Sequence, residues 1–230
     1  MAKRNTYLSY VLFILLAVIL LWISSNRYEL FNNFVNENNT IIDTSVNETE
    51  EQDHAEKYIQ ADSVVLELGG RYGTVSAVIN NKLSNRLNHV VVEPDQTVWN
   101  ALEKNKINTG SQFHILRGFI SNKRLSLEGD GYAITQKDDE NSSIPSYTLD
   151  EIEKMYNLKF NTLVADCEGC LETFFDQNPL IYKDLNLILM EADYPNKCNY
   201  EKIKNNLRTY SFREISSNDD AFHTVWVKNI

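Results

Sequence analysis

The chain has 230 residues, of which 43% are hydrophobic. This is enough for one domain of about 180 residues with a sizeable core. The net charge is −10 and the isoelectric point is about 4.9, so the chain would repel a phosphate backbone, and nucleic acid is not an expected partner. Three cysteines, two of them in a Cys-x-x-Cys pattern, exclude a dense disulfide framework.

The N-terminus predicts a membrane anchor. Residues 7–23 hold no charged side chain, and as a helix they would span about 26 Å, which suffices for a thin bilayer. Two basic residues precede them, which favours a cytosolic tail at 1–6 and a transmembrane signal anchor at 7–23. The rest of this single-pass protein would then lie in a lumen or outside the cell. A cleaved signal peptide is the competing interpretation, since cleavage could occur at Ser24-Ser25.

Residues 24–52 are rich in Asn, Glu and Thr, and they predict a flexible stalk. From residue 53 to 230 the pattern is that of a globular domain, with a short helix expected near 56–61. The N-glycosylation pattern occurs at Asn38, Asn47 and Asn141, which agrees with a lumenal orientation.

The globular part begins with a strand, a glycine turn and a helix. Residues 64–68 are an apolar run with β-branched members, which predicts a strand buried on both faces of a parallel sheet. Gly69 and Gly70 end the run, and Gly73 precedes a helical pattern. Such glycines let the backbone approach a ligand, and a helix start offers free N–H groups. The dinucleotide fingerprint G-x-G-x-x-G is absent, and an ordinary strand-to-helix turn is the alternative.

Acidic residues recur at the predicted strand ends. Glu67 lies near the end of the first strand, and Glu93 ends a second strand at 89–93. A carboxylate in the second place can accept both ribose hydroxyls of a nucleotide. Glu191 and Asp193 end a later strand. Because ligands bind at the carboxyl ends of strands in open α/β sheets, these acids indicate a site rather than a solvated surface.

Asp166 and Glu168 follow the buried strand at 163–165 directly. These carboxylates could act as a general base, grip a cofactor amino group or hold a metal. A solvated acidic turn is the alternative. Cys167 and Cys170 could have a redox or zinc role, although a zinc site needs further ligands.

The remaining pattern completes an alternation of strands and helices, followed by two final strands. It predicts a doubly wound, Rossmann-like α/β sheet closed by a C-terminal antiparallel hairpin. Gly118 and Phe119 follow a third strand, where Phe119 could either enclose a purine ring or belong to the core. The four histidines show no metal-ligand spacing and are expected to be structural. The expected elements are a helix at 95–106, a strand at 112–116, a hairpin at 125–136, a helix at 150–158 capped by Thr148, a helix at 200–207 and strands at 212–215 and 224–228.

Together, four motifs resemble the FkbM family of methyltransferases. They lie at 67–73, 92–95, 148–150 and 166–170, and the resemblance covers roughly residue 58 to the C-terminus. It implies a seven-stranded class I methyltransferase domain at 53–230 and methyl transfer from S-adenosylmethionine, often to a hydroxyl of a sugar or another small molecule. Leu171 departs from the family pattern, which has a second Glu there, and Gly70 replaces the more usual Ala.

The resemblance also implies roles for individual residues. Asp166 or Glu168 would orient or deprotonate a hydroxyl or carboxyl acceptor, which we expect to be a small molecule or a glycan. Two alternatives remain open: a variant in which Asp166 and neighbouring acids hold a divalent metal such as Mg²⁺, and a catalytically inactive, membrane-tethered binding module. The residues implied in cofactor binding are Glu67, Gly69, Gly70, Arg71, Gly73, Glu93, Pro94, Gly118 and Phe119.

Overall fold

The structure is a computed structural model that describes residues 34–129, 134–217 and 222–229. The tail expected at 1–6 and the membrane anchor expected at 7–23 lie outside these residues. Within the described ranges, no helix combines the length and the apolar character needed to cross a membrane.

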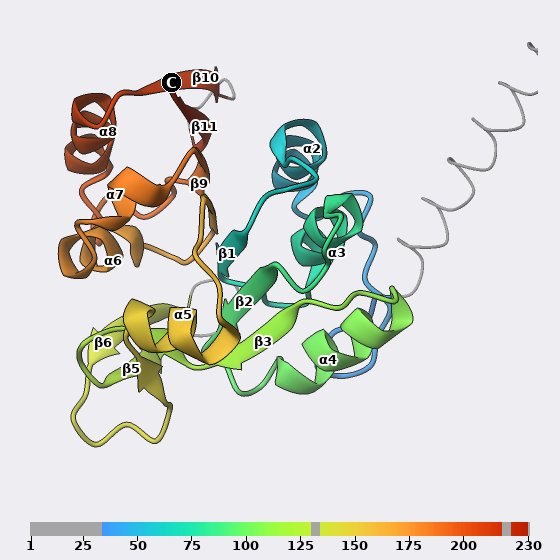
Figure 1. Cartoon of the computed structure of the whole chain (residues 1–230). Coiled ribbons are helices and arrows are strands. Elements are labelled where there is room, and N and C mark those ends of the chain that lie inside the picture. The colour runs from blue at the N-terminus through green and yellow to red at the C-terminus, as the bar shows by residue number, and fades with distance from the viewer. Residues whose placement is uncertain (1–33, 130–133, 218–221, 230) are drawn as a thin grey trace, which may run out of the picture.

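A seven-stranded sheet forms the centre of the domain, as Figure 1 shows. Its strand order is β10-β11-β9-β8-β1-β2-β3; β11 pairs antiparallel with both β10 and β9, and the other four pairs are parallel. The prediction of a doubly wound sheet with a C-terminal antiparallel hairpin is therefore confirmed. The strands are β1 (Val65–Leu68), β2 (His89–Glu93), β3 (His114–Arg117), β8 (Thr162–Ala165), β9 (Leu187–Glu191), β10 (Phe212–Ser217) and β11 (His223–Lys228).

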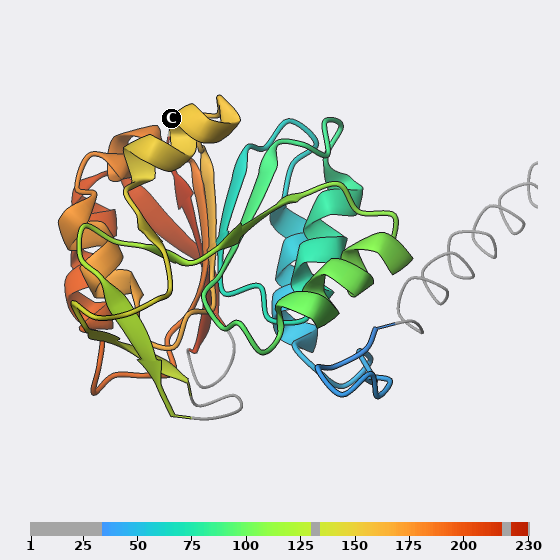
Figure 2. The ribbon, with the colours of Figure 1, turned by 90° about the horizontal axis from the view of Figure 1, so that it is seen from below.

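Helices cover both faces of the sheet (Figure 2). The central strands are apolar throughout because alternate residues enter two different cores. Leu66 of β1 packs toward the face that carries α5, α6, α7 and α8, whereas Val65 packs toward α2 and α3. The helices are α2 (Thr49–Tyr58), α3 (Thr74–Lys82), α4 (Trp99–Asn108), α5 (Leu149–Tyr156), α6 (Leu171–Gln177), α7 (Ile181–Asp184) and α8 (Tyr200–Thr209).

Two small sheets lie between β3 and α5. The hairpin expected at 125–136 is present as β5 (Leu125–Glu128) and β6 (Thr135–Asp138), which pair antiparallel. In addition, β4 (Phe119–Ile120) pairs with β7 (Ser146–Tyr147). Thr148 caps α5 as expected, and it forms a capping box with Glu151.

The helix after β2 begins later than the sequence pattern predicts. Asp95, the expected cap, instead accepts the backbone N–H of Thr97 (2.9 Å) and its hydroxyl (2.7 Å). This local turn of the Asx type delays the start of α4 to Trp99.

The sequence predicts a flexible stalk at 24–52, and the structure corrects this for residues 34–52, the part that it describes. Residues 34–48, which we call the N-terminal strap, pack on the domain, and α2 already begins at Thr49. Phe34 is 1% exposed, and the Asn105 side chain bonds to the N–H (2.8 Å) and the C=O (2.9 Å) of Val35. The strap is polar in composition, but a few spaced apolar side chains such as Phe34 and Ile42 suffice to dock it.

Candidate active site

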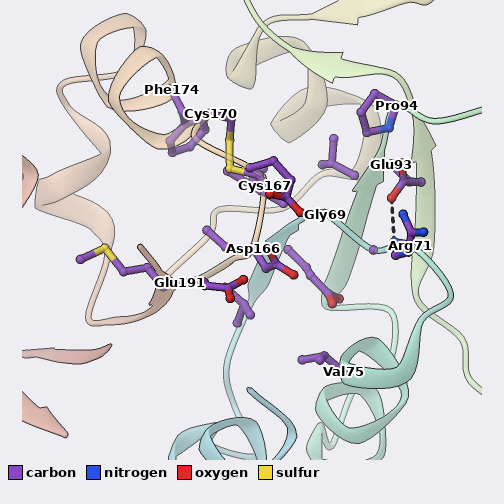
Figure 3. Close-up of a pocket in the computed structure, with 18 of the residues that line it drawn as sticks. Gly69, Arg71, Val75, Glu93, Pro94, Asp166, Cys167, Cys170, Phe174 and Glu191 are labelled. Atoms are coloured by element: carbon purple, nitrogen blue, oxygen red, sulfur yellow. Dashed lines mark hydrogen bonds between the residues drawn. A yellow bond between two sulfur atoms is a disulfide. The ribbon is translucent and has the colours of Figure 1, made fainter. Parts of the chain in front are cut away.

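A large pocket opens at the carboxyl ends of the central strands (Figure 3). It encloses about 1330 Å³ of empty space, part of which is open to solvent. Residues from β1, β2, β8 and β9 line it, together with the start of β11 and residues of the strap and α2. After β3 the chain returns to the opposite side of β1, so the pocket lies at the switch point of the sheet, where ligands bind in open α/β folds.

The glycine turn after β1 contacts the end of β8 directly. Gly69 has φ +89°, and a Cβ atom there would lie 1.7 Å from the backbone oxygen of Asp166. At Gly70 a Cβ atom would lie 2.2 Å from Cγ1 of Val91. Both glycines line the pocket, so bare backbone faces the space that a ligand would occupy.

Gly73 lies at the start of α3. It is not among the pocket-lining residues that the structure describes. It precedes α3 with φ +81°, and a Cβ atom there would lie 2.8 Å from Cδ1 of Leu102. Close packing between α3 and α4 thus accounts for a glycine here, and the expected cofactor contact stays a prediction.

Glu93 is fixed at the end of β2 by the main chain. The N–H of Arg71 donates to Oε2 (2.6 Å, dashed in Figure 3), and the N–H of Asp95 donates to Oε1 (2.7 Å). Burial raises the pKa of Glu93 to about 7, although the two N–H groups favour the charged form. Glu93, Arg71 and Pro94 all line the pocket, and their contact with a cofactor stays a prediction.

Glu67 also lines the pocket, but its carboxylate is already engaged. Its Oε2 lies 2.8 Å from Nε2 of His89, and both side chains are buried. Because His89 begins the neighbouring strand, this bond joins β1 to β2.

Gly118 and Phe119 line the pocket beyond β3. Their N–H groups donate to Glu93 O (3.1 Å) and Pro145 O (2.9 Å), which ties the segment to β2 and to the loop before β7. Phe119 is only 4% exposed. Phe119 is therefore a core residue at the pocket edge, and a contact with a purine ring stays a prediction.

Asp166 forms a carboxyl pair with Glu191. Burial, and then the hydrogen bond and the repulsion from Glu191, raise the pKa of Asp166 well above its ordinary value. Burial also disfavours charge on Glu191, but hydrogen bonds from His223 and Asp166 outweigh it and lower the pKa of Glu191. Asp166 therefore holds the shared proton and donates it to the Glu191 carboxylate.

His223 belongs to this site, although the sequence analysis assigned it a structural role. Its Nε2 lies 2.8 Å from Glu51 Oε1 and 3.3 Å from Glu191 Oε1. Burial opposes the charged imidazolium, but the bonds to Glu191 and Glu51 raise the pKa of His223 to about 10. The signal in the sequence was the final hairpin, because an antiparallel last strand places His223 opposite Glu191.

Two further acids of the site come from the N-terminal part of the chain. Glu48 ends the strap and accepts a hydrogen bond from the Thr74 hydroxyl, and Glu51 lies in the first turn of α2. Burial, and then repulsion from Glu51, raise the pKa of Glu48 to about 8. Neither residue is predicted from the sequence, because the composition of residues 24–52 predicts a flexible stalk.

The structure does not test the divalent metal expected at Asp166, which stays a prediction. Among the described residues, Glu51, Glu191 and His223 could hold a metal, because their ligand atoms lie within 4.8 Å of one another. The ion pairs of His223 account for this arrangement, and His223 would have to lose a proton before it could bind a metal.

Glu168 lies in a tight turn between the two cysteines of the Cys-x-x-Cys pattern. Cys167 and Cys170 form a disulfide, which leaves no thiolate for the zinc site considered above. Glu168 is half-buried and hydrogen-bonded to Asp193 and Tyr194. Burial, and then repulsion from Asp193, raise its pKa to about 8.

No family model and no curated protein match the chain, so the resemblance to the FkbM family stays a prediction. Among solved structures, the chain is similar to a protein in the NADB-Rossmann superfamily from Streptococcus agalactiae, with 7% identity over 78% of this chain and 68% of that chain and a TM-score of 0.50. It is also similar to precorrin-6y C5,15-methyltransferase from Geobacter metallireducens (11% identity, 79% and 87% covered, TM-score 0.47). A third similar structure is fibrillarin from Aeropyrum pernix with bound S-adenosyl-L-methionine (12% identity, 78% and 73% covered, TM-score 0.47). At such identities, the first of these matches shows a Rossmann-like fold and nothing beyond it.

Proposed function

We propose that this chain is an S-adenosylmethionine-dependent methyltransferase that acts on a small hydroxyl or carboxyl acceptor, such as a sugar or glycan. The observation that carries the proposal is the switch-point pocket. There, bare glycine backbone at the end of β1 faces a carboxylate fixed at the end of β2. The resemblance of the motifs at 67–73 and 166–170 to the FkbM family supports the same activity and the choice of acceptor.

The residues of the pocket fit this cofactor. Gly69 and Gly70 line the pocket with backbone, because close packing against Asp166 and Val91 leaves no room for a side chain at either position. The Glu93 oxygens each accept one N–H, and a carboxylate has lone pairs left for ribose hydroxyls. Phe119 offers an apolar edge for a purine. When bound, the cofactor would supply an electrophilic methyl group on a positively charged sulfonium, and that charge would favour the ionised form of the carboxyls around it.

We assign the role of general base to Glu168 rather than to Asp166. Methyl transfer to a hydroxyl requires a group that accepts the acceptor proton. Both residues carry the raised pKa of a carboxyl pair, Asp166 with Glu191 and Glu168 with Asp193. Glu168 is the less buried of the two, and with a pKa of about 8 it becomes able to accept a proton as the pH rises toward that value. Asp166 would instead keep the Glu191 carboxylate in place beside the acceptor.

Calorimetric titration of S-adenosylhomocysteine into residues 34–230 tests the proposal. This range keeps the N-terminal strap, which packs on the domain. We expect micromolar binding, its loss in Glu93→Ala, and unchanged binding in Glu140→Ala, which alters an exposed residue outside the pocket. Absence of binding by a folded parent would contradict the proposal and favour the inactive, tethered binding module.

We further propose that residues 7–23 anchor the protein and that the folded domain lies in a lumen or outside the cell. The uncharged N-terminal stretch supports this, and so does the Cys167–Cys170 disulfide, because disulfides persist in oxidising compartments. In cells, we expect a glycosidase to increase the mobility of the full chain on a gel, and Asn38→Gln to remove part of that change. An unchanged mobility, together with full modification of Cys167 and Cys170 by thiol reagents, would contradict this location.

A further inference from the structure

The disulfide closes a four-residue turn that carries Glu168. The N–H of Cys170 donates to Cys167 O (3.2 Å), and the two Cα atoms are 5.4 Å apart. The two residues between the cysteines both have left-handed backbone, with φ +53° at Glu168 and φ +88° at Gly169. Figure 3 shows the disulfide beside Gly69 and Phe174, on the wall of the pocket.

The conformation of Glu168 is one that a glutamate does not favour by itself. A residue with a Cβ atom loses roughly 1–2 kcal/mol in the left-handed region, whereas glycine loses almost nothing. An unconstrained turn would therefore let Glu168 return to right-handed or extended backbone, which would carry its carboxylate away from Asp193 and Tyr194. The disulfide opposes this because it joins the two ends of the turn.

Both sides of the turn are closely packed. On one side, a Cβ atom at Gly169 would lie 2.8 Å from Cβ of Lys197 and 3.3 Å from Cβ of Tyr194. On the other side, the backbone oxygen of Asp166 fills the space where Gly69 lacks a side chain. The turn is thus held between the loop after β9 and the glycine turn, and a change in its shape would reach the pocket.

We propose that the Cys167–Cys170 disulfide is a positioning device for Glu168, and that its reduction to two thiols releases Glu168 from the pocket wall. The consequence for catalysis rests on the proposed function, in which Glu168 is the base. Cys167 and Cys170 are then positioning residues, which act on the reaction through Glu168.

The reduction step needs a dithiol. With dithiothreitol, the S–S bond between Cys167 and Cys170 breaks and two S–H groups form, while the two thiols of the reagent become a cyclic disulfide. Two electrons and two protons pass to the protein for each molecule of reagent consumed. Cys198 is a buried free thiol outside this exchange, so it serves as an internal reference for thiol counting.

Carbon-13 NMR of the glutamate side-chain carboxyls in residues 34–230 tests the proposal without cofactor or acceptor. Glu168→Gln identifies the signal of Glu168. In the oxidised chain we expect this signal to titrate near pH 8, because Glu168 is buried and faces Asp193, Tyr194 and Glu191, with Asp166 beside it. After reduction, we expect the titration midpoint to fall by about one pH unit or more, toward that of an ordinary glutamate in solvent.

Matched variants separate this effect from other effects of the reductant. The double variant Cys167→Ser/Cys170→Ser should show the lowered midpoint without reductant and no response to it. Cys198→Ser should behave as the parent, and reoxidation of the parent should restore the original midpoint. An unchanged midpoint in the reduced, folded parent would overturn the proposal. Loss of the far-ultraviolet circular dichroism signal on reduction would also overturn it, because the disulfide would then stabilise the whole domain rather than one turn.

Once an acceptor is known, a kinetic split tests the catalytic consequence. We expect reduction to lower kcat about tenfold while the KM for the cofactor changes less than about twofold. Unchanged kcat with a shifted Glu168 signal would overturn the link to catalysis. If the oxidised parent does not bind S-adenosylhomocysteine, the proposed function fails, whereas the NMR result still decides whether the disulfide positions Glu168.

Discussion

The two walls of the pocket differ in the groups that bond to their carboxylates. In the glycine wall, which is Gly69, Gly70 and Glu93, the carboxylate accepts hydrogen bonds from backbone N–H groups. In the acid wall, which is Asp166, Glu168, Glu191 and His223, carboxyl groups bond to other ionisable side chains. Backbone donors do not titrate, whereas a bond between two carboxyls requires a shared proton. The glycine wall is thus suited to hold a ligand, and the acid wall is suited to exchange protons.

The largest effect is expected from Gly69→Ala, which would disrupt the contact between Gly69 in one wall and Asp166 in the other. Its Cβ atom would lie 1.7 Å from the Asp166 oxygen, at φ +89°. We expect a loss of roughly 3 kcal/mol or more in the free energy of unfolding, and loss of S-adenosylhomocysteine binding. Gly110→Ala is the matched control, because it also has a positive φ but no atom within 4 Å, and it should cost only about 1 kcal/mol. Urea unfolding and calorimetry measure both, and equal losses in the two variants would contradict the close contact.

Glu168→Gln tests whether the acid wall carries the proton transfer. Glu168 accepts a proton only when it is ionised, so the rate of methyl transfer should rise with pH up to about 8 in the parent. The variant should lose roughly 100-fold in kcat and lose this rise, while its affinity for S-adenosylhomocysteine stays close to that of the parent. Glu172→Gln should keep the parental profile, because Glu172 lies outside the pocket and bonds to the N–H of Asn199 and to Lys202. A pH profile that is unchanged in Glu168→Gln would assign the base to another group.

Asn105→Ala tests how far the glycine wall depends on the N-terminal strap. The Asn105 side chain makes three buried hydrogen bonds, two to Val35 and one to the C=O of Tyr72 in the glycine turn. Loss of this side chain should lower the free energy of unfolding by about 2 kcal/mol and weaken cofactor binding, because buried hydrogen-bond partners would be left unsatisfied. Asn205→Ala on α8, where Asn205 is exposed and its side chain bonds to Arg208, should cost less than about 0.5 kcal/mol. If both variants unfold at the same urea concentration, the strap does not support the wall.

His223 should make the stability of the fold depend on pH. Its pKa of about 10 in the folded chain exceeds the ordinary value of 6.5. Its contribution to stability is therefore fully present below pH 6.5 and is lost as the pH rises toward 10. Between pH 7 and pH 10, the free energy of unfolding should fall more in the parent than in His223→Gln. His114→Gln is the control: burial lowers the pKa of His114, so this variant should follow the parent over the same range.

The sequence predicts the features that arise from neighbouring residues. Apolar runs that end in an acid locate the ends of β1, β2 and β8, and with them Gly69, Glu93 and Asp166, because burial and turn preferences act over a few residues. The sequence does not predict contacts between distant segments. Asn105 and Val35 are 70 residues apart, and His223 and Glu51 are 172 residues apart. The Cys-x-x-Cys pattern was visible, but its disulfide depends on the left-handed backbone at Glu168, which residue type alone disfavours.

The position of β1 in the sheet also has a consequence for how the chain folds. β1 pairs with β2 on one side and with β8 on the other, and the N–H of Val64 donates to Oδ1 of Asn161, 97 residues later. The glycine turn after β1 can therefore pack against the end of β8 only after most of the chain has been synthesised and β8 has paired with β1. Parallel pairing over such a separation is slow, because the chain loses loop entropy before the contacts form. Assembly of the binding pocket is thus expected to be a late step in folding, and ligands that recognise it would stabilise only the finished domain.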